Sequence, residues 1–108
     1  MSEFRSLIDE TELQTKRAIK HRFRARIFEA WGHQCAYCAE RADTLDHVRP
    51  RHKGGATVAT NLVPACRNCN RRKGSEEWQQ WFNRQDYYLL DRELAVLRWI
   101  QAFDDRTL

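Results

Sequence analysis

The chain has 108 residues, of which 42% are hydrophobic and 31% are charged. This length and balance are typical of a folded domain and argue against an intrinsically disordered chain. No apolar run approaches the roughly 20 residues that a membrane-spanning helix needs, and residues 1–9 lack the pattern of a secretory signal. We therefore expect one cytoplasmic domain, residues 1–108, with no membrane partner.

The net charge of +4 is unevenly distributed along the chain. Residues 16–75 carry fourteen Lys and Arg against four acidic residues, whereas residues 1–15 and residues 76–108 each have a net charge of −3. A concentrated basic segment attracts polyanions, above all nucleic acid. We favour nucleic-acid binding, although a basic face that only contacts water would have the same composition.

The first predicted element is a helix over residues 10–31. Apolar residues recur every fourth position from Ile19 to Trp31, and Gly32 is a natural C-terminal cap. Much of the remaining helix surface is basic. Like charges four residues apart repel each other on a helix, and a phosphate backbone would turn that cost into a gain. The alternative is a helix that points its charges only at water. We predict that this helix contacts DNA through Lys16, Arg17, Lys20 and Arg24.

Four cysteines follow, in two Cys-x2-Cys pairs that are 27 residues apart. Cys35 pairs with Cys38, and Cys66 pairs with Cys69. Disulfides are rare in a reducing compartment, whereas two such pairs can supply four thiolates to one tetrahedral zinc ion. A thioredoxin-like redox pair would explain one of the two pairs and leave the other unexplained. We therefore predict a structural Zn²⁺ site made by all four cysteines.

Two short extended segments are expected between the cysteine pairs. Residues 44–48 have the apolar and β-branched content of a strand, and residues 61–64 have the pattern of a returning strand. Gly54 and Gly55 provide a turn that can adopt positive φ angles. This arrangement predicts a β-hairpin.

Helices are expected from the second cysteine pair to the end of the chain. Residues 67–73 can form a short helix that ends at Gly74. Ser75 is a suitable N-cap for a helix over residues 75–83, and a last helix is predicted over residues 91–103. With the hairpin, these helices predict an α+β fold.

Polar residues lie between and just after the cysteine pairs. Asp46 offers an oxygen ligand for a hard cation, and Asn70 offers a neutral oxygen directly after a cysteine. His47 has an ordinary pKa near neutrality, so its imidazole can accept a proton from water. Because neighbouring strand residues point to opposite faces, Asp46 and His47 can serve one site only at a strand end or distortion. Each residue alone is a weak signal, but their order within the four-cysteine frame is a strong one.

The segment 35–74 resembles the HNH endonucleases, in particular their four-cysteine, zinc-bearing branch. The resemblance implies a ββα-metal core, in which a β-hairpin and a helix hold a catalytic divalent ion. Here that core would be stapled by the zinc site and flanked by a basic N-terminal helix and two C-terminal helices. The motifs that carry the resemblance are the two cysteine pairs, Asp46-His47, Gly54-Gly55, Asn61-Leu62, Asn70 and Lys73-Gly74.

The resemblance also implies a role for each polar residue. His47 would be the general base that activates water, and Asn61 would hold the loop that orients His47; these two form the predicted catalytic set. Asp46 and Asn70 would bind the catalytic ion, expected to be Mg²⁺ or Mn²⁺. Many family members have His where Asn70 stands, so this chain is an H-N-N variant, and an oxygen ligand there favours harder ions.

The predicted function is metal-dependent hydrolysis of phosphodiester bonds in DNA, with double-stranded DNA as the expected substrate. One alternative is a zinc-stapled module that binds nucleic acid without catalysis, and another is a zinc-stapled protein-interaction domain. No separate recognition element is visible, so a protein partner or an oligomer would supply target specificity. Near the predicted active site, the residues expected to contact phosphates are Arg49, Arg51, Arg71, Arg72 and Lys73.

Overall fold

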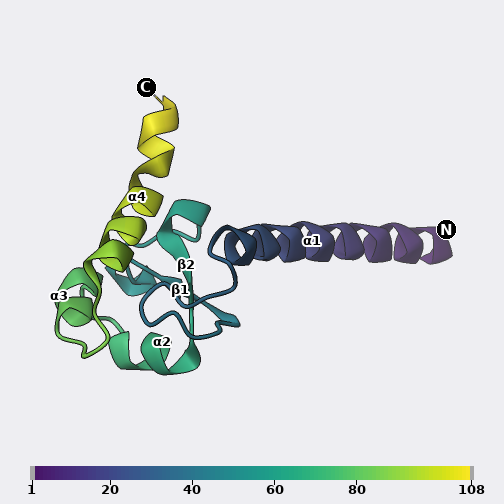
Figure 1. The fold of residues 1–108 in the computed structure, drawn as a ribbon. Helices are drawn as coiled ribbons and strands as arrows, with labels where there is room; N and C mark the ends of the chain where they lie inside the picture. Colours follow the sequence, from purple (N-terminus) through teal and green to yellow (C-terminus); the bar gives the residue numbers. More distant parts are fainter. Residues whose placement is uncertain (1, 108) are drawn as a thin grey trace.

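The computed structural model describes the backbone of residues 2–107 and the side chains of residues 15–102. It is a small α+β fold with a two-stranded antiparallel sheet and helices around it, as predicted (Figure 1). In chain order the elements are α1 (Ser2–Ala30), β1 (Thr44–His47), the 3-10 helices η1 (Arg51–Lys53) and η2 (Ala59–Asn61), β2 (Leu62–Ala65), α2 (Arg67–Lys73), α3 (Trp78–Asn83) and α4 (Leu90–Thr107).

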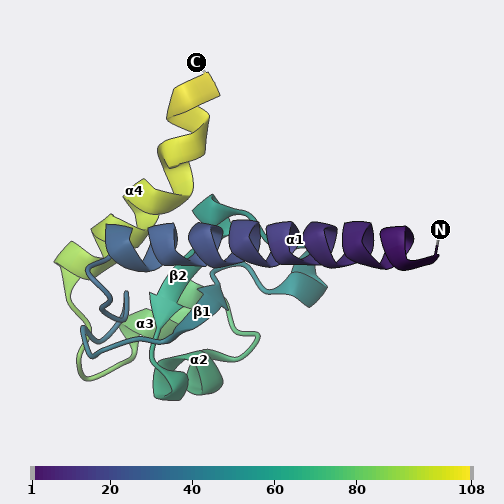
Figure 2. The same ribbon diagram turned by 90° about the vertical axis from the view of Figure 1, so that its right-hand side faces the viewer.

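Helix α1 is longer than predicted and extends away from the other elements. It begins at Ser2 rather than at residue 10, because residues 2–9 contain no Gly or Pro that would interrupt a helix. In both ribbon views its N-terminal half projects beyond the rest of the molecule (Figure 1, Figure 2). Ile27 is 2% exposed, whereas Ile19 is 57% exposed. The predicted apolar stripe is therefore buried toward its C-terminal end only.

The end of α1 follows the prediction that Gly32 caps it. Gly32 adopts a φ of +62°, a conformation that a residue without a Cβ takes at little cost. Its N–H donates to the Glu29 carbonyl at 3.1 Å, and the His33 N–H donates to the Phe28 carbonyl at 2.8 Å. These two bonds satisfy carbonyls of the last helical turn and direct the chain into the loop that carries Cys35.

The two strands pair in antiparallel fashion, in the register that sets Thr44 opposite Ala65 and His47 opposite Leu62. All four residues of β2 are buried, which agrees with their apolar sequence. Helix α2 packs against β1, and α1 packs against β2. The hairpin predicted from residues 44–48 and 61–64 is confirmed, and it lies at the centre of the molecule.

The loop between the strands turns where two glycines were predicted to allow it. Gly54 adopts a φ of +91°, and the Gly55 N–H donates to the Pro50 carbonyl at 2.9 Å. A Cβ at Gly55 would lie 1.8 Å from the Arg49 carbonyl oxygen, which is closer than atoms can approach. Only glycine can therefore occupy position 55 without moving the backbone of the loop.

The C-terminal helices differ from the prediction at their ends. Helix α2 ends before Gly74 as predicted, but α3 begins at Trp78 rather than at position 75. The Glu77 carboxylate caps α3 by accepting from the Gln80 N–H at 2.8 Å, so the prediction that Ser75 is the N-cap is wrong. Helix α4 exceeds the predicted range at both ends, since no helix-breaking residue limits it there.

An aromatic cluster forms the core between the first cysteine pair and α3. The ring of Tyr37 contacts Trp81 edge-on at a centroid distance of 5.1 Å and Phe82 at 5.5 Å, and all three are buried. Val96 of α4 is also fully buried. Trp78 also belongs to this core, since Trp78 is 6% exposed and Trp81 is 3% exposed.

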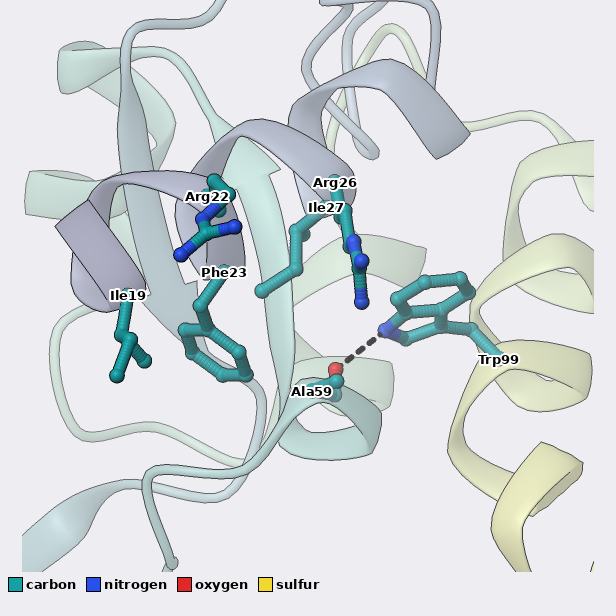
Figure 3. Close-up of a pocket in the computed structure, with 7 residues that line it drawn as sticks. All are labelled: Ile19, Arg22, Phe23, Arg26, Ile27, Ala59 and Trp99. Atoms are coloured by element: carbon teal, nitrogen blue, oxygen red, sulfur yellow. Dashed lines mark hydrogen bonds between the residues drawn. The ribbon is translucent and has the colours of Figure 1, made fainter.

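A groove of about 570 Å³ lies between α1 and α4. Figure 3 shows Phe23 and Ile27 of α1 on one side and Trp99 of α4 on the other. The Trp99 indole N–H donates to the Ala59 carbonyl at 2.7 Å and to the Leu62 carbonyl at 2.8 Å, which fixes α4 against η2 and β2. None of the predicted zinc-binding, catalytic or DNA-contacting residues lines this groove.

Candidate active site and metal centre

The four cysteines come together from two separate segments. One pair lies in the loop between α1 and β1, and the other pair lies at the beginning of α2. Their sulfur atoms all lie within 4.8 Å of one another. Among the side chains of residues 15–102, no other group of three or more His, Cys, Asp or Glu is arranged to hold a metal ion. Four thiolates at this spacing fit a tetrahedral zinc ion with no open coordination position.

The crowded sulfurs need a cation if all of them are to be thiolates. A hydrogen bond from the Cys69 thiol lowers the pKa of Cys35 to about 5, and the same contact raises the pKa of Cys69. Burial raises the pKa of Cys38 to about 11. The Cys35 sulfur therefore ionises easily, whereas the sulfurs of Cys38 and Cys69 do not. A divalent ion between the sulfurs would offset the repulsion between neighbouring thiolates and bring all four cysteines into the thiolate form.

Hydrogen bonds from several elements hold the cysteine loops in place. The Cys69 N–H donates to the Cys66 sulfur at 3.4 Å, so Cys66 also caps α2. The Tyr87 hydroxyl lies 3.2 Å from the Cys69 sulfur, and the Arg92 guanidinium donates to the Cys35 carbonyl at 3.1 Å. Contacts of this kind orient metal ligands and tune their basicity.

Asp46 points toward the buried side of β1 and is 4% exposed. The Tyr37 hydroxyl donates to Asp46 Oδ2 at 2.7 Å, and Lys73 Nζ lies 3.2 Å from Oδ2 and 3.3 Å from Oδ1. Burial raises the pKa of Asp46, while the Lys73 charge and the Tyr37 hydroxyl oppose that shift. Burial and the Asp46 charge raise the pKa of Tyr37, so its hydroxyl stays protonated and acts as the donor. Both carboxylate oxygens are thus already engaged within the protein.

His47 is the next residue and makes its contacts on the surface. Its side chain is partly exposed, and Nε2 lies 3.0 Å from the Thr57 hydroxyl oxygen. Burial and the nearby charge of Arg51 lower the pKa of His47 below its ordinary value of 6.5, against the opposing effect of Asp46. The imidazole is therefore neutral at pH 7, the form in which it can accept a proton. The pair lies at a strand end, because β1 ends at His47, but the Asp46 side chain points inward and the His47 side chain lies toward the surface.

Asn61 ties together the two ends of the loop that follows His47. Its Oδ1 accepts from the Arg49 N–H at 2.8 Å, and its Nδ2 donates to the carbonyls of Arg49 at 3.1 Å and Ala56 at 2.9 Å. Ala56 directly precedes Thr57, the residue that contacts the imidazole. Asn61 thus fixes the backbone shortly after His47 and again directly before Thr57, an arrangement suited to a positioning residue.

Asn70 lies on α2 and faces the beginning of β1. Its Nδ2 is 3.3 Å from both the Leu45 carbonyl oxygen and the Thr44 hydroxyl oxygen. Because the amide nitrogen makes these two contacts, the amide oxygen is the atom that remains to act as a ligand. The structure therefore brings Asn70 close to the strand that carries Asp46 and His47.

The predicted DNA-contacting residues are on the surface, with one exception. Arg49, Arg51, Arg71 and Arg72 are exposed, as are Lys16, Arg17 and Lys20 of α1, and Arg24 is partly exposed beside the ring of Phe28. Lys73 is different: it is 2% exposed, and its ammonium binds Asp46 and donates to the His47 carbonyl at 3.0 Å. Lys73 is therefore not placed to contact a phosphate backbone, which corrects the prediction from sequence.

Sequence reasoning missed two contributors to the site, Tyr37 beside Asp46 and Thr57 beside His47, and it gave Lys73 a different role. Lys73 had a usable signal, because it follows Cys69 by four residues and so shares its face of α2. If Cys69 faces a buried metal, Lys73 must also face inward. The contacts of Tyr37 and Thr57 join segments that are distant in the sequence, and no local sequence pattern indicates them.

Residues 35–76 match the HNH endonuclease family. This confirms the resemblance inferred from the motifs between Cys35 and Gly74. A CRISPR-associated endonuclease Cas9 from Corynebacterium diphtheriae is 29% identical over an alignment of 83 residues, and the match covers 72% of the chain. The chain spans 8% of that relative's length. These matches support a nuclease family for residues 35–76.

Proposed function

We propose that the chain is a metal-dependent endonuclease that hydrolyses phosphodiester bonds in DNA. The observation that carries this proposal is the neutral, partly exposed imidazole of His47 at the end of β1, within the segment that matches HNH endonucleases. A base of this kind must be unprotonated and accessible to water at the working pH. His47 meets both requirements.

In the proposed reaction, His47 takes a proton from a water molecule as the water oxygen attacks phosphorus. The new P–O bond forms as the bond to the leaving sugar oxygen breaks, and that oxygen takes a proton from solvent. The Thr57 hydroxyl fixes the orientation of the imidazole ring. Asn61 acts one step further away, because it holds the backbone next to Thr57.

Asp46 and Asn70 are the proposed ligands of a catalytic Mg²⁺ or Mn²⁺ ion. Their carboxylate and amide oxygens are donors that such hard ions prefer. When bound, the ion would neutralise charge on the leaving oxygen and on a non-bridging phosphate oxygen. Asp46 would bind the ion beside the Lys73 ammonium, which its two carboxylate oxygens already contact. The ion would weaken that ion pair, because two cations at the same carboxylate repel each other.

The four-cysteine site is proposed to hold a structural Zn²⁺ ion that takes no direct part in catalysis. Four thiolates fill every position of a tetrahedral ion, so no position is left for water or substrate. The contribution of this site is therefore to join the loop before β1 to the beginning of α2.

Double-stranded DNA is the proposed substrate, held through the exposed basic residues of α1, of the loop after His47 and of α2. Such contacts read little sequence, so we propose that a protein partner or an oligomer supplies target specificity. No described helix has both the length and the apolar character needed to cross a bilayer. The expected cytoplasmic location stays a prediction.

One observation favours a second candidate, a zinc-stapled module that binds nucleic acid without cutting it. Tyr37 and Lys73 already contact the Asp46 carboxylate. A module that only binds nucleic acid needs no metal ligand at Asp46, so these contacts would stay in place. Such a module would keep salt-dependent DNA binding but would show no cleavage in the presence of Mg²⁺ or Mn²⁺. A domain that binds only other proteins would show neither.

A plasmid-cleavage assay separates these functions. Supercoiled DNA is incubated with the zinc-loaded wild type or with His47→Ala, in buffer containing Mg²⁺, Mn²⁺ or EDTA. The nuclease proposal expects relaxed or linear DNA from the wild type with a divalent ion, and intact plasmid with EDTA or with the variant. Intact plasmid in every lane, from folded protein that binds DNA, would instead support the binding module.

A further inference from the structure

Tyr37 links the metal centre to the strand that carries the candidate active site. It stands between Cys35 and Cys38 in the chain and is fully buried. Its hydroxyl donates to Asp46 Oδ2 at 2.7 Å. A direct hydrogen bond therefore runs from the loop that contributes two metal ligands to a residue adjacent to His47.

Contacts of the neighbouring backbone and of the ring fix the position of the Tyr37 hydroxyl. The Ala36 N–H donates to the Pro64 carbonyl at 2.9 Å, which fixes the backbone next to Tyr37 against β2. The ring is held edge-on by Trp81 at a centroid distance of 5.1 Å. With the two flanking cysteines bound to an ion, the backbone would be held on both sides of Tyr37 as well.

The contact continues beyond Asp46 toward His47. Asp46 holds the Lys73 ammonium through both carboxylate oxygens, and that ammonium donates to the His47 carbonyl at 3.0 Å. Buried hydrogen-bonded groups of this kind reinforce one another in a low dielectric. The hydroxyl, the carboxylate and the ammonium form one connected network around the backbone of His47.

We propose that Tyr37 is a positioning residue that couples the four-cysteine metal centre to the active-site strand through its hydrogen bond to Asp46. Its importance for cleavage rests on the proposed nuclease function, whereas the physical coupling to Asp46 does not. Tyr37 touches neither substrate nor the reacting atoms. Its hydroxyl sets where the Asp46 carboxylate and the Lys73 ammonium lie, and through them the end of β1.

The test compares Tyr37→Phe with Tyr88→Phe, a matched loss of one hydroxyl from the same aromatic cluster. Tyr88 packs on Phe82, as Tyr37 does, but its hydroxyl donates to Glu93 rather than to Asp46. We expect Tyr37→Phe to lower kcat about tenfold or more, since a hydrogen bond to a buried charged acceptor is lost, and to leave KM unchanged. Tyr88→Phe should leave both unchanged. Cobalt-substituted protein should show the same thiolate absorption bands for both variants, because no ligand is altered.

A second measurement examines Asp46 without any need for activity. In zinc-loaded protein, the ¹³C NMR signal of the Asp46 carboxylate should move in Tyr37→Phe and stay in place in Tyr88→Phe. If the wild type does not cleave DNA but its Asp46 signal moves in Tyr37→Phe, the nuclease proposal is wrong and the coupling is still supported. An active wild type with unchanged kcat in Tyr37→Phe, or an unmoved Asp46 signal, would overturn the coupling.

Discussion

The two sides of β1 differ sharply, although they are built from adjacent residues. Asp46 faces a closed interior in which Tyr37 and Lys73 occupy its oxygens. His47 faces the surface, where Thr57 is its hydrogen-bond partner. Strand geometry alone sends neighbours to opposite sides, so one short strand can carry both a rigid support and a reactive group.

This difference shows how stability and reactivity are separated at the site. The closed side is expensive to disturb, because removal of one partner leaves an uncompensated buried charge. The open side makes few contacts, so His47 can change its protonation state without disturbing the core. We therefore expect loss of the buried Lys73 charge on the closed side to affect folding first, and loss of the His47 imidazole on the open side to affect chemistry first.

Removal of the zinc ion should have the largest effect, since the four-cysteine site supports both sides of β1. Structural zinc contributes about 10 kcal/mol or more to folding in zinc-finger peptides, so chelation should abolish cooperative unfolding of the HNH segment. Circular dichroism and tryptophan fluorescence during heating would measure this, and added Zn²⁺ should restore the transition. An unchanged melting curve after complete chelation would contradict a folding role for the ion.

The next largest effect is expected on the closed side, from Lys73→Met. The Asp46 carboxylate would lose its buried counter-charge, and the free energy of unfolding should fall by about 3–5 kcal/mol. Lys53→Met is the matched control, because Lys53 is exposed and should change stability by no more than about 0.5 kcal/mol. Urea denaturation of both zinc-loaded variants measures the difference. Equal stability of the two would mean that Lys73 is not a structural counter-ion.

A smaller effect is expected from Asn61→Ala, which disconnects the loop on the open side. Three hydrogen bonds to Arg49 and Ala56 are lost, and we expect a cost of about 1–3 kcal/mol. Hydrogen exchange should accelerate at the Arg49 amide, which Asn61 accepts from in the wild type. Asn68→Ala, which removes an exposed contact on α2, serves as the control. Unchanged protection at Arg49 would show that Asn61 does not hold the loop.

The smallest effect is expected in the pH dependence of cleavage. His47 acts as a base only when neutral, and its pKa in the folded protein lies below 6.5. The value of kcat should therefore be constant near pH 7 and fall as the pH drops below 6.5. Arg51→Ala removes a charge that lowers this pKa, so its profile should shift toward higher pH. Coincident profiles for the two proteins would argue against Arg51 acting on His47, and no fall in acid would argue against His47 as the base.

Much of the four-cysteine site and of the hairpin could be predicted, because these features depend on local sequence patterns. The spacing of the cysteines, the glycine turn and the apolar strands predicted a hairpin between two metal-binding pairs, and these features are present. The closed side could not be predicted in the same way. In the sequence, Lys73 lies among other basic residues and has the pattern of one more surface charge. Its burial follows from how α2 packs on β1. The length of α1 was underestimated because its early residues have no strong periodic pattern.

The separation of the two sides of β1 is tested most directly by one paired measurement on zinc-loaded His47→Ala. Urea unfolding and Mg²⁺- or Mn²⁺-dependent plasmid cleavage are recorded on the same preparation, beside the wild type. We predict an unfolding midpoint close to that of the wild type, because His47 has an exposed side-chain hydrogen bond, together with loss of cleavage. Wild-type cleavage by this folded variant would contradict His47 as the base and, with it, the division between a supporting side and a reactive side.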